Sequence, residues 1–369
     1  MLRVDQGEST SEFYGQSHAA EQAPLALAEA QHLWEPSNPY LNTASYGLPP
    51  RPGWEALQAA LADWRGGRTS WEHWGESTEG ARAAFARLTG VAVSRVTVGA
   101  TVSELVGLVA AAVPDGTRVV VPDVEFTSLL FPWMVHADRG LEVMTVPLHR
   151  LAETIDARTG VVAFSAVQSA TGELADLDAV LAACRHHGTL TVVDATQACG
   201  WLPLDGSRFD VVACGAYKWL MSPRGTAFMS VSDELLERLK PLHAGWYAGE
   251  NPHASYYGPP LRLAASARRL DTSPAWFSWV GTQPALELIE RIGIETICEH
   301  DLSLANRFRT GLGLEPYGSA IVSTEVPGAE RRLEQAGIRA SVRGGRLRTS
   351  FHVYNTQADV DAVLEALLG

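Results

Sequence analysis

Lysine is almost absent from this chain of 369 residues. Lys218 and Lys240 are its two lysines, so arginine supplies the other 27 of its 29 basic side chains. A GC-rich genome that favours arginine codons accounts for this bias without any functional reason. The scarcity still limits any chemistry that needs a lysine amine to two positions.

Cysteine is also scarce, and its spacing excludes the usual metal patterns. The four cysteines are Cys184, Cys199, Cys214 and Cys298, with no CxxC pair among them. We therefore expect reduced thiols and no metal site.

Basic clusters and long apolar runs are missing as well. Lys+Arg 29 against Asp+Glu 42 gives a net charge of -13, which disfavours nucleic acid or an anionic membrane as a partner. The longest apolar run, 105–113, is far short of the ~20 residues that cross a bilayer. Asp5 and Glu8 lie where a secretory signal has its apolar core. We expect a cytoplasmic protein whose partner is neither nucleic acid nor a membrane.

The remaining composition is that of a globular protein with room for two domains. Residues 1–35 are polar and rich in Gln, Ser and Glu, which predicts a flexible N-terminal arm. Residues 36–260 are expected to form a large domain. Residues 261–369 are expected to form a smaller α+β domain, completed by part of the N-terminal segment.

Short β-branched runs alternate with helical patterns through the large domain. Strands are predicted at 96–99, 118–121, 142–146, 161–167, 190–194, 211–215 and 226–231. Helices are predicted at 54–64, 80–88, 103–112, 129–138, 177–187, 282–292, 295–309, 329–336 and 358–368, and C-terminal strands at 338–342 and 346–351. Continuously apolar strands between helices indicate an α/β fold, with a mostly parallel seven-stranded sheet sandwiched by helices.

Lys218 is the stronger of the two candidates for amine chemistry. It follows the predicted strand 211–215 and precedes Trp219 and Leu220. Apolar surroundings disfavour the charged ammonium, lower its pKa and free the amine as a nucleophile. The alternative is a surface lysine whose charged end reaches water, and Lys240, in the amphipathic pattern DELLERLKPL, fits that alternative.

Asp194 ends the strand 190–194 and is either a helix N-cap or a ligand contact. Ligands of doubly wound sheets bind beyond the carboxyl ends of the strands, where both Asp194 and Lys218 are expected. Pyridoxal 5'-phosphate (PLP) needs a lysine for its Schiff base and an acid beside its pyridine nitrogen. The two residues together therefore point to PLP.

A helix N-terminus is available for the phosphate of such a cofactor. In VTVGATVSEL a strand is followed by a turn at Ala100 and Thr101, and a helix begins at Val102 or Ser103. The unpaired N–H groups of a first turn attract an anion. The alternative is that Ser103 is simply an N-cap.

Six segments of the chain stand out by their order and spacing: VGATVSEL, PDVEFTSLLFPW, VQSATGE, VVDATQACG, CGAYKW and RTSFHVYNT. Their arrangement resembles that of the class V aminotransferase family of fold-type I PLP enzymes. The resemblance runs from about residue 40 to residue 368. It is nearest to the branch that holds cysteine desulfurases, kynureninase and isopenicillin N epimerase. The family implies a fold-type I large domain and a homodimer with shared active sites.

The resemblance assigns roles to individual residues. Lys218 resembles the Schiff-base lysine, Asp194 the partner of the pyridine nitrogen and Gln197 the neighbour of the ring oxygen. The phosphate cradle corresponds to Ala100, Thr101 and Val102.

Four further positions match cofactor or substrate contacts. Tyr217 stands where relatives often have a histidine before the lysine, and its hydroxyl can still hydrogen-bond the phosphate. Ser169 lies in the substrate and cofactor loop. Ser273 matches a position that reaches the phosphate of the partner subunit. Arg348 resembles the arginine that grips the substrate α-carboxylate, for which a planar guanidinium is suited; an ion-paired surface strand residue is the alternative.

The sequence also departs from the family pattern. The side chain that stacks on the cofactor ring corresponds in register to Thr127, with Phe126 beside it. Gly215 replaces a serine that donates to the phosphate. No cysteine follows Cys298, so the nucleophilic cysteine of the desulfurases is missing.

These features predict a PLP-dependent enzyme that acts on an amino acid. Loss of a sulfur group from Cβ of a cysteine conjugate, a C–S lyase reaction, fits a desulfurase-like scaffold without its persulfide cysteine. Transamination to a 2-oxo acid is the alternative, and epimerisation or decarboxylating deamination in secondary metabolism is a third. A non-catalytic protein that keeps the cofactor is the remaining alternative, against which the joint presence of Lys218, Asp194 and Arg348 argues.

Overall fold

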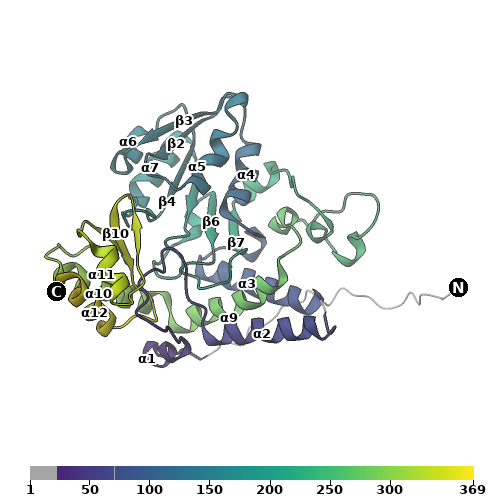
Figure 1. The fold of residues 1–369 in the computed structure, drawn as a ribbon. Helices are drawn as coiled ribbons and strands as arrows, with labels where there is room; N and C mark the ends of the chain where they lie inside the picture. Colours follow the sequence, from purple (N-terminus) through teal and green to yellow (C-terminus); the bar gives the residue numbers. More distant parts are fainter. Residues whose placement is uncertain (1–22, 70) are drawn as a thin grey trace.

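The computed structural model describes residues 23–69 and 71–369, and its largest feature is a seven-stranded sheet (Figure 1). Its strands are buried along most of their length, as expected when helices cover both faces. The strands are β1 Val96–Gly99, β2 Arg118–Pro122, β3 Glu142–Val146, β4 Thr159–Ser165, β5 Leu190–Asp194, β6 Val211–Gly215 and β7 Ala227–Val231.

The strand order is β1-β7-β6-β5-β4-β2-β3. Strand β7 runs antiparallel to both of its neighbours, and every other neighbouring pair is parallel. The predicted mostly parallel seven-stranded sheet is thereby confirmed. Parallel strands end at the same edge, so Ser165, Asp194 and Ala213 lie side by side across β4, β5 and β6.

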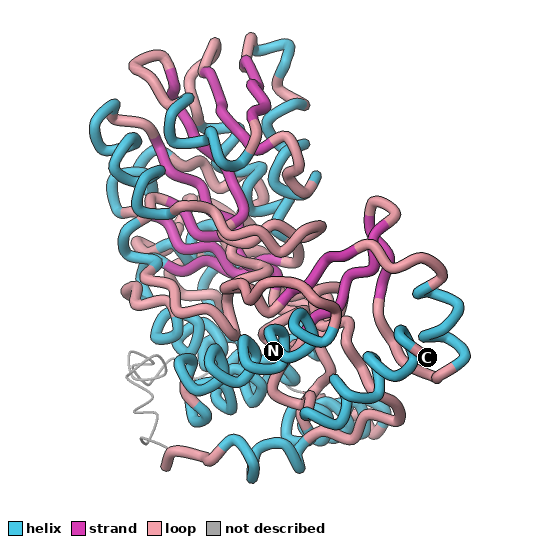
Figure 2. Tube along the Cα trace, turned by 90° about the vertical axis from the view of Figure 1, so that its left-hand side faces the viewer, coloured by secondary structure: helices cyan, strands magenta, loops and turns pink. Residues whose placement is uncertain are grey.

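The helices surround this sheet and build a smaller unit beside it (Figure 2). They are α1 Leu27–Ala30, α2 Arg51–Arg65, α3 Trp71–Leu88, α4 Val102–Ala112, α5 Thr127–Met134, α6 Leu151–Thr154, α7 Leu177–His187, α8 Asp233–Arg238, α9 Trp276–Ile292, α10 Ile294–Gly311, α11 Ala329–Gln335 and α12 Gln357–Leu368. Among the described residues, no helix has both the length and the apolar character needed to cross a membrane.

Two apolar layers form the core of the large unit. Alternate strand residues such as Val120 and Val162 pack on one face against α3, α7 and α9. Their neighbours Val119 and Val161 pack on the opposite face against α4, α5 and α8. Because adjacent side chains of a strand point to opposite faces, every central strand contributes to both layers.

The smaller unit is an antiparallel sheet covered by helices. Its strands are β8 Ile321–Thr324, β9 Ser341–Arg343 and β10 Arg346–Ser350, in the order β8-β10-β9. Residues of α10, α11 and α12 pack with the sheet around Phe351. The sequence did not predict β8, because four residues are too short a run to show a period of two.

Several helices extend beyond their predicted bounds. Helix α9 begins at Trp276 and α3 at Trp71, where aromatic and glycine residues hide the helical period. The predicted helix 129–138 is instead α5, which ends at Met134. A short 3-10 turn follows it and ends at Gly140, whose φ of 75° is left-handed.

The expected flexible arm differs from the structure in its last residues. Residues 1–22 lie outside the described residues, but 25–34 pack onto the body of the protein. Leu25 N donates to Arg291 O at 2.8 Å, Gln31 Nε2 donates to Val353 O at 3.0 Å, and Trp34 is 5% exposed. Apolar side chains within a polar segment therefore join this segment to α9 and to the C-terminal unit.

Candidate active site

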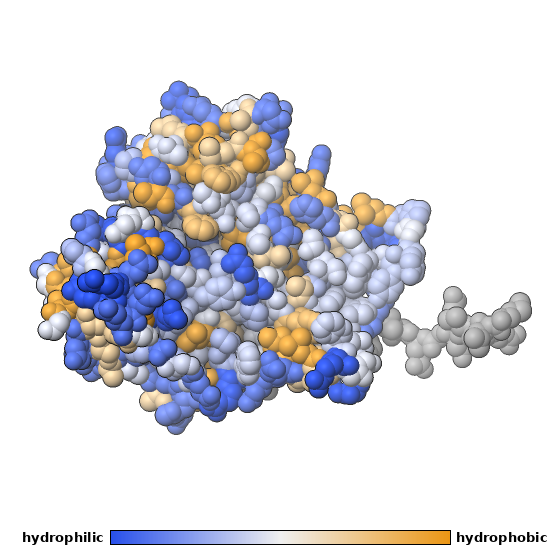
Figure 3. All heavy atoms as spheres, in the orientation of Figure 1, coloured by the Kyte–Doolittle hydropathy of each residue, from blue (hydrophilic) through white to orange (hydrophobic). Residues whose placement is uncertain are grey.

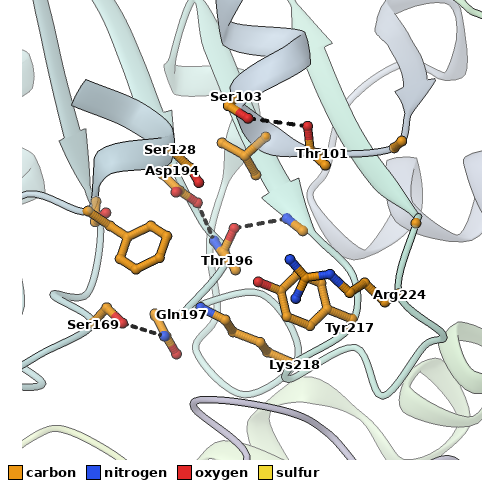
Figure 4. Close-up of a pocket in the computed structure, with 16 residues that line it drawn as sticks. Thr101, Ser103, Ser128, Ser169, Asp194, Thr196, Gln197, Tyr217, Lys218 and Arg224 are labelled. Atoms are coloured by element: carbon orange, nitrogen blue, oxygen red, sulfur yellow. Dashed lines mark hydrogen bonds between the residues drawn. The ribbon is translucent and has the colours of Figure 1, made fainter. Parts of the chain in front are cut away.

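A cavity of about 220 Å³ opens beyond the carboxyl ends of the parallel strands (Figure 4). Its lining includes most of the residues that the sequence predicted for a PLP site: Ala100, Thr101, Val102, Phe126, Ser169, Asp194, Gln197, Tyr217 and Lys218. These residues come from five separate segments of the chain. The strand order brings them together, as the topology of doubly wound sheets requires.

Lys218 lies in this cavity as a buried amine. It follows β6 and is 6% exposed, with its Nζ 5.3 Å from the Phe126 ring centroid and 5.7 Å from that of Tyr217. Within residues 23–69 and 71–369, no hydrogen bond or ion pair to Nζ is found. Burial lowers the pKa of Lys218 to about 8, although Asp194 opposes this shift. Lys240, in contrast, is exposed after α8.

Asp194 supplies a buried carboxylate to the same cavity. It is the last residue of β5 and is 5% exposed. One oxygen, Oδ1, accepts from Thr196 N at 2.8 Å, which fixes the carboxylate in place. Burial raises the pKa of Asp194, and the hydrogen bonds from Thr196 and the charge of Lys218 oppose this. A cation brought to this carboxylate would offset the free-energy cost of burying its charge.

The N-terminus of α4 faces the cavity with Thr101 as its N-cap. Thr101 Oγ1 accepts from Glu104 N at 3.2 Å, and Glu104 Oε2 accepts from Ala100 N at 3.0 Å. Both contacts are typical of a capped helix start. The Ala100 N–H is thus already bonded within the chain, and the first N–H groups of α4 remain as donors for an anion.

Gln197 is held firmly beside the cavity. Its Nε2 donates to Ala44 O at 2.9 Å and to Ser169 Oγ at 3.0 Å, and its Oε1 accepts from Trp219 Nε1 at 2.7 Å. The indole N–H can only donate, so this contact fixes which end of the amide carries the oxygen. The Nε2 of Gln197 therefore faces Ser169 and the cavity (Figure 4).

Arg348 is a buried guanidinium whose hydrogen-bond partners in the described chain are neutral oxygens. It is 2% exposed, and its Nη1 donates to Ser169 O at 2.6 Å and its Nη2 to Ser45 Oγ at 2.7 Å. In the described part of the chain no carboxylate lies within 4.0 Å of it. Burial, followed by the charge of Arg343, lowers its pKa to about 10. The ion-paired surface residue considered as an alternative is thus not what the structure shows.

Three predicted residues do not line the cavity of this chain: Arg348, which contacts the lining residue Ser169, and also Thr127 and Ser273. Thr127 is exposed as the first residue of α5, whereas Phe126, its N-cap residue, lines the cavity. Phe126 and Thr127 were both predicted as cofactor contacts, and which of them stacks on the ring stays a prediction. Ser273 is exposed between Asp271 and α9, and its predicted contact with a partner subunit stays a prediction.

Other lining residues were missed by the sequence analysis, including Ser128, Thr196 and Arg224. Glu125, next to Phe126, is also buried near Asp194. It accepts from Ser165 N at 2.8 Å and from Gln168 Nε2 at 3.1 Å. A polar residue just past a strand end was the available signal for Glu125, whereas no pattern singled out Arg224.

Comparison with known proteins agrees with this geometry. The fold and the cavity define a fold-type I enzyme of the PLP-dependent class. A family model described as aminotransferase class-V matches residues 58–325. The chain belongs to the class V aminotransferase family.

Two relatives and two solved structures show what the chain is similar to. An uncharacterized aminotransferase, YcbU, of Bacillus subtilis (strain 168) is 27% identical, covering 81% of this chain and 85% of its own. Isopenicillin N epimerase of Streptomyces clavuligerus is 28% identical, covering 78% and 83%. The solved structure of the cystine C-S lyase C-DES has a TM-score of 0.81 at 22% identity, covering 90% and 97%. Another structure, of a C-DES mutant, has glycine covalently linked to its PLP cofactor.

Proposed function

We propose that this protein binds PLP on Lys218 and cleaves the C–S bond of a cysteine conjugate. The observation that carries the cofactor assignment is the buried Lys218 amine, with no hydrogen bond or ion pair in the described chain and a lowered pKa, in one cavity with Asp194. Bound PLP supplies an electron sink for the electrons left on Cα when a proton is removed. The residues around the cavity fit such a group.

Each polar residue then has a defined task. Asp194 keeps a proton at the pyridine nitrogen, because its buried carboxylate is stabilised by a cation. Arg348 binds the substrate carboxylate and fixes the orientation of Cα. With PLP bound and a substrate amine in its place, the Lys218 amine would be free to remove the α-proton, and a pKa of about 8 suits a base near neutral pH.

The absence of a suitable thiol favours lyase chemistry over persulfide formation. Cys184, Cys199 and Cys214 are buried, Cys298 is half-buried, and none of the four lines the cavity. Ahead of Arg348, β9 and β10 are joined directly by Gly344 and Gly345. The sulfur would therefore leave as a thiolate, taking the electron pair of its bond to Cβ, and would take up the proton that Lys218 removed from Cα. Hydrolysis of the remaining enamine by water would give pyruvate and ammonia.

The transaminase is the second candidate function. It needs only Lys218, Asp194 and Arg348, and a relative at 27% identity carries the name aminotransferase. Incubation with an S-substituted cysteine separates the two. Equal amounts of thiol, pyruvate and ammonia are expected for the lyase, whereas persistent pyridoxamine phosphate without ammonia would contradict it.

A homodimer with shared active sites completes the proposal. Helix α5 and the residue after it expose Phe131, Met134 and Val135, which are 54%, 49% and 71% exposed. Apolar residues also gather on the upper part of the face drawn in Figure 3, where Figure 1 places α5. A second copy of the chain is the occupant we propose for this surface. Sedimentation analysis of the wild type and of Val135→Glu tests this dimer. The Val135→Glu variant is expected to shift towards monomer.

A further inference from the structure

Arg224 is held at the cavity by a turn whose backbone is fixed on both sides. Thr226 Oγ1 donates to Pro223 O at 2.8 Å, and Ser278 Oγ donates to Arg224 O at 2.9 Å. Gly225 follows with a φ of 95°, which other residues rarely adopt. The turn therefore directs the Arg224 side chain before any ligand binds.

The Arg224 guanidinium lines the cavity and stacks on Tyr217. Its central carbon lies 4.8 Å from the Tyr217 ring centroid. No carboxylate lies within 4.0 Å of it in residues 23–69 and 71–369. In Figure 4 the guanidinium extends across Tyr217 into the cavity, with Ser169 at the opposite side of the view. The cavity thus presents a cation that has no carboxylate partner among the described residues.

The other charged residues of the cavity lining leave Arg224 free to bind an anion. Among the lining residues only Asp194, Lys218 and Arg224 carry a formal charge. Under the proposed function Asp194 serves the pyridine nitrogen, and the Lys218 amine bonds to the aldehyde carbon. Arg224 is then the lining cation left for the phosphate dianion of PLP, which would otherwise be met by the uncharged donors of α4 and Tyr217.

The phosphate end of the cavity needs such a charge. Ala100 N is already bonded to Glu104, whose carboxylate lies next to the start of α4. Gly215 lines the cavity without any side-chain donor. Arginine presents a planar fork of N–H groups that matches two phosphate oxygens.

We propose that Arg224 binds the 5'-phosphate of PLP through a charge-assisted contact. This assignment rests on the proposed function, and it makes Arg224 a cofactor-binding residue. It predicts that Arg224 distinguishes PLP from pyridoxal, which has the same aldehyde and ring but no phosphate. The loss of a charge-assisted hydrogen bond corresponds to roughly a 10- to 100-fold weaker affinity.

The test titrates the purified apoprotein with PLP and, separately, with pyridoxal, and follows the visible absorbance of the Lys218 adduct. Arg224→Gln is expected to weaken PLP binding by the stated factor and to leave pyridoxal binding unchanged. Arg224→Lys keeps the charge without the planar fork, so an intermediate loss is expected. Arg309→Gln is the matched control, because Arg309 also stacks on a tyrosine, Tyr317, at 5.6 Å but does not line the cavity.

Each result decides the assignment. An unchanged PLP affinity in Arg224→Gln, or an equal loss for PLP and pyridoxal, overturns it. If Arg224→Gln lowers the unfolding temperature of the apoprotein, the assignment is judged on Arg224→Lys instead. The quantity compared is again the ratio of the affinity for PLP to the affinity for pyridoxal. A wild type that binds neither aldehyde overturns the proposed function and this assignment together, whereas loss of the phosphate preference alone overturns only the role of Arg224.

Discussion

The imidazole of His352 joins Asp301 to the backbone carbonyl of Trp219, the residue next to Lys218. Nδ1 lies 2.9 Å from Asp301 Oδ2, and Nε2 lies 2.9 Å from Trp219 O. A carbonyl only accepts hydrogen bonds, so Nε2 carries a proton. Both side chains are fully buried. Helix α10 and the segment after β10 therefore hold the lysine-bearing turn of the large unit in place.

Removal of one partner from this pair is expected to be costly. His352→Phe leaves the Asp301 carboxylate buried without its partner, and we expect the free energy of unfolding to fall by about 3–5 kcal/mol. The measurement is urea denaturation of the apoprotein. Asp301→Leu in the same chain removes the stranded charge and should restore much of the loss. Equal stability of His352→Phe and the double variant would contradict this account.

The two lysines provide a matched comparison for the cofactor site. Lys218→Ala is expected to abolish both the visible absorbance with PLP and the activity, because no other amine of the described residues lines the cavity. Lys240→Ala should leave both intact, since Lys240 is exposed after α8. Absorbance spectra and activity assays of both variants check this. Equal loss in the two variants would remove Lys218 from its proposed role.

The lowered pKa of Lys218 also predicts a gain of stability on its replacement. An ordinary lysine has a pKa of 10.5, and burial lowers that of Lys218 to about 8. At neutral pH the folded apoprotein therefore holds a buried charge that the unfolded chain solvates, at a cost of about 3 kcal/mol. Lys218→Met removes this cost, so the apoprotein becomes more stable while losing PLP binding.

The pH dependence has a definite sign. Between pH 8 and 10.5 the unfolded chain keeps the Lys218 proton and the folded chain releases it. The free energy of unfolding of the wild type therefore rises with pH in this range, as far as Lys218 determines it. The advantage of Lys218→Met should be full below pH 8 and should shrink as the pH rises towards 10.5. Thermal unfolding of both apoproteins at several pH values measures this, and a constant difference would refute the buried charge.

The sequence predicted the parts of the molecule that depend on local pattern. Continuous apolar runs predicted the strands, and the 24-residue spacing of Asp194 and Lys218 across neighbouring strands placed both in one cavity. Strand β8 was missed, and residues 25–34 were assigned to a flexible arm of which a part was expected to complete the smaller domain. Tertiary packing, not periodicity, orders both segments. Whether Phe126 or Thr127 faces the cavity depends on the residue at which α5 begins, and sequence locates a helix start only to within a few residues. Arg224 depends on a turn geometry that no local pattern reveals.

Arg348 allows a test of substrate recognition that leaves the cofactor untouched. Its guanidinium contacts Ser169, Ser45 and Ser341 without any acidic partner in the described chain, so a substrate carboxylate is the anion it lacks. Arg348→Lys keeps the charge but loses the planar fork, and we expect KM to rise roughly 10- to 100-fold.

The affinity for PLP should stay unchanged in Arg348→Lys, because Arg348 does not line the cavity beside the predicted phosphate cradle. Arg343→Lys is the control, since Arg343 is exposed and reaches the same Ser45 hydroxyl at 3.3 Å. Steady-state kinetics and PLP titration of both variants separate substrate binding from cofactor binding. A fall in PLP affinity with an unchanged KM would show that Arg348 supports the fold of the cavity and does not bind the substrate.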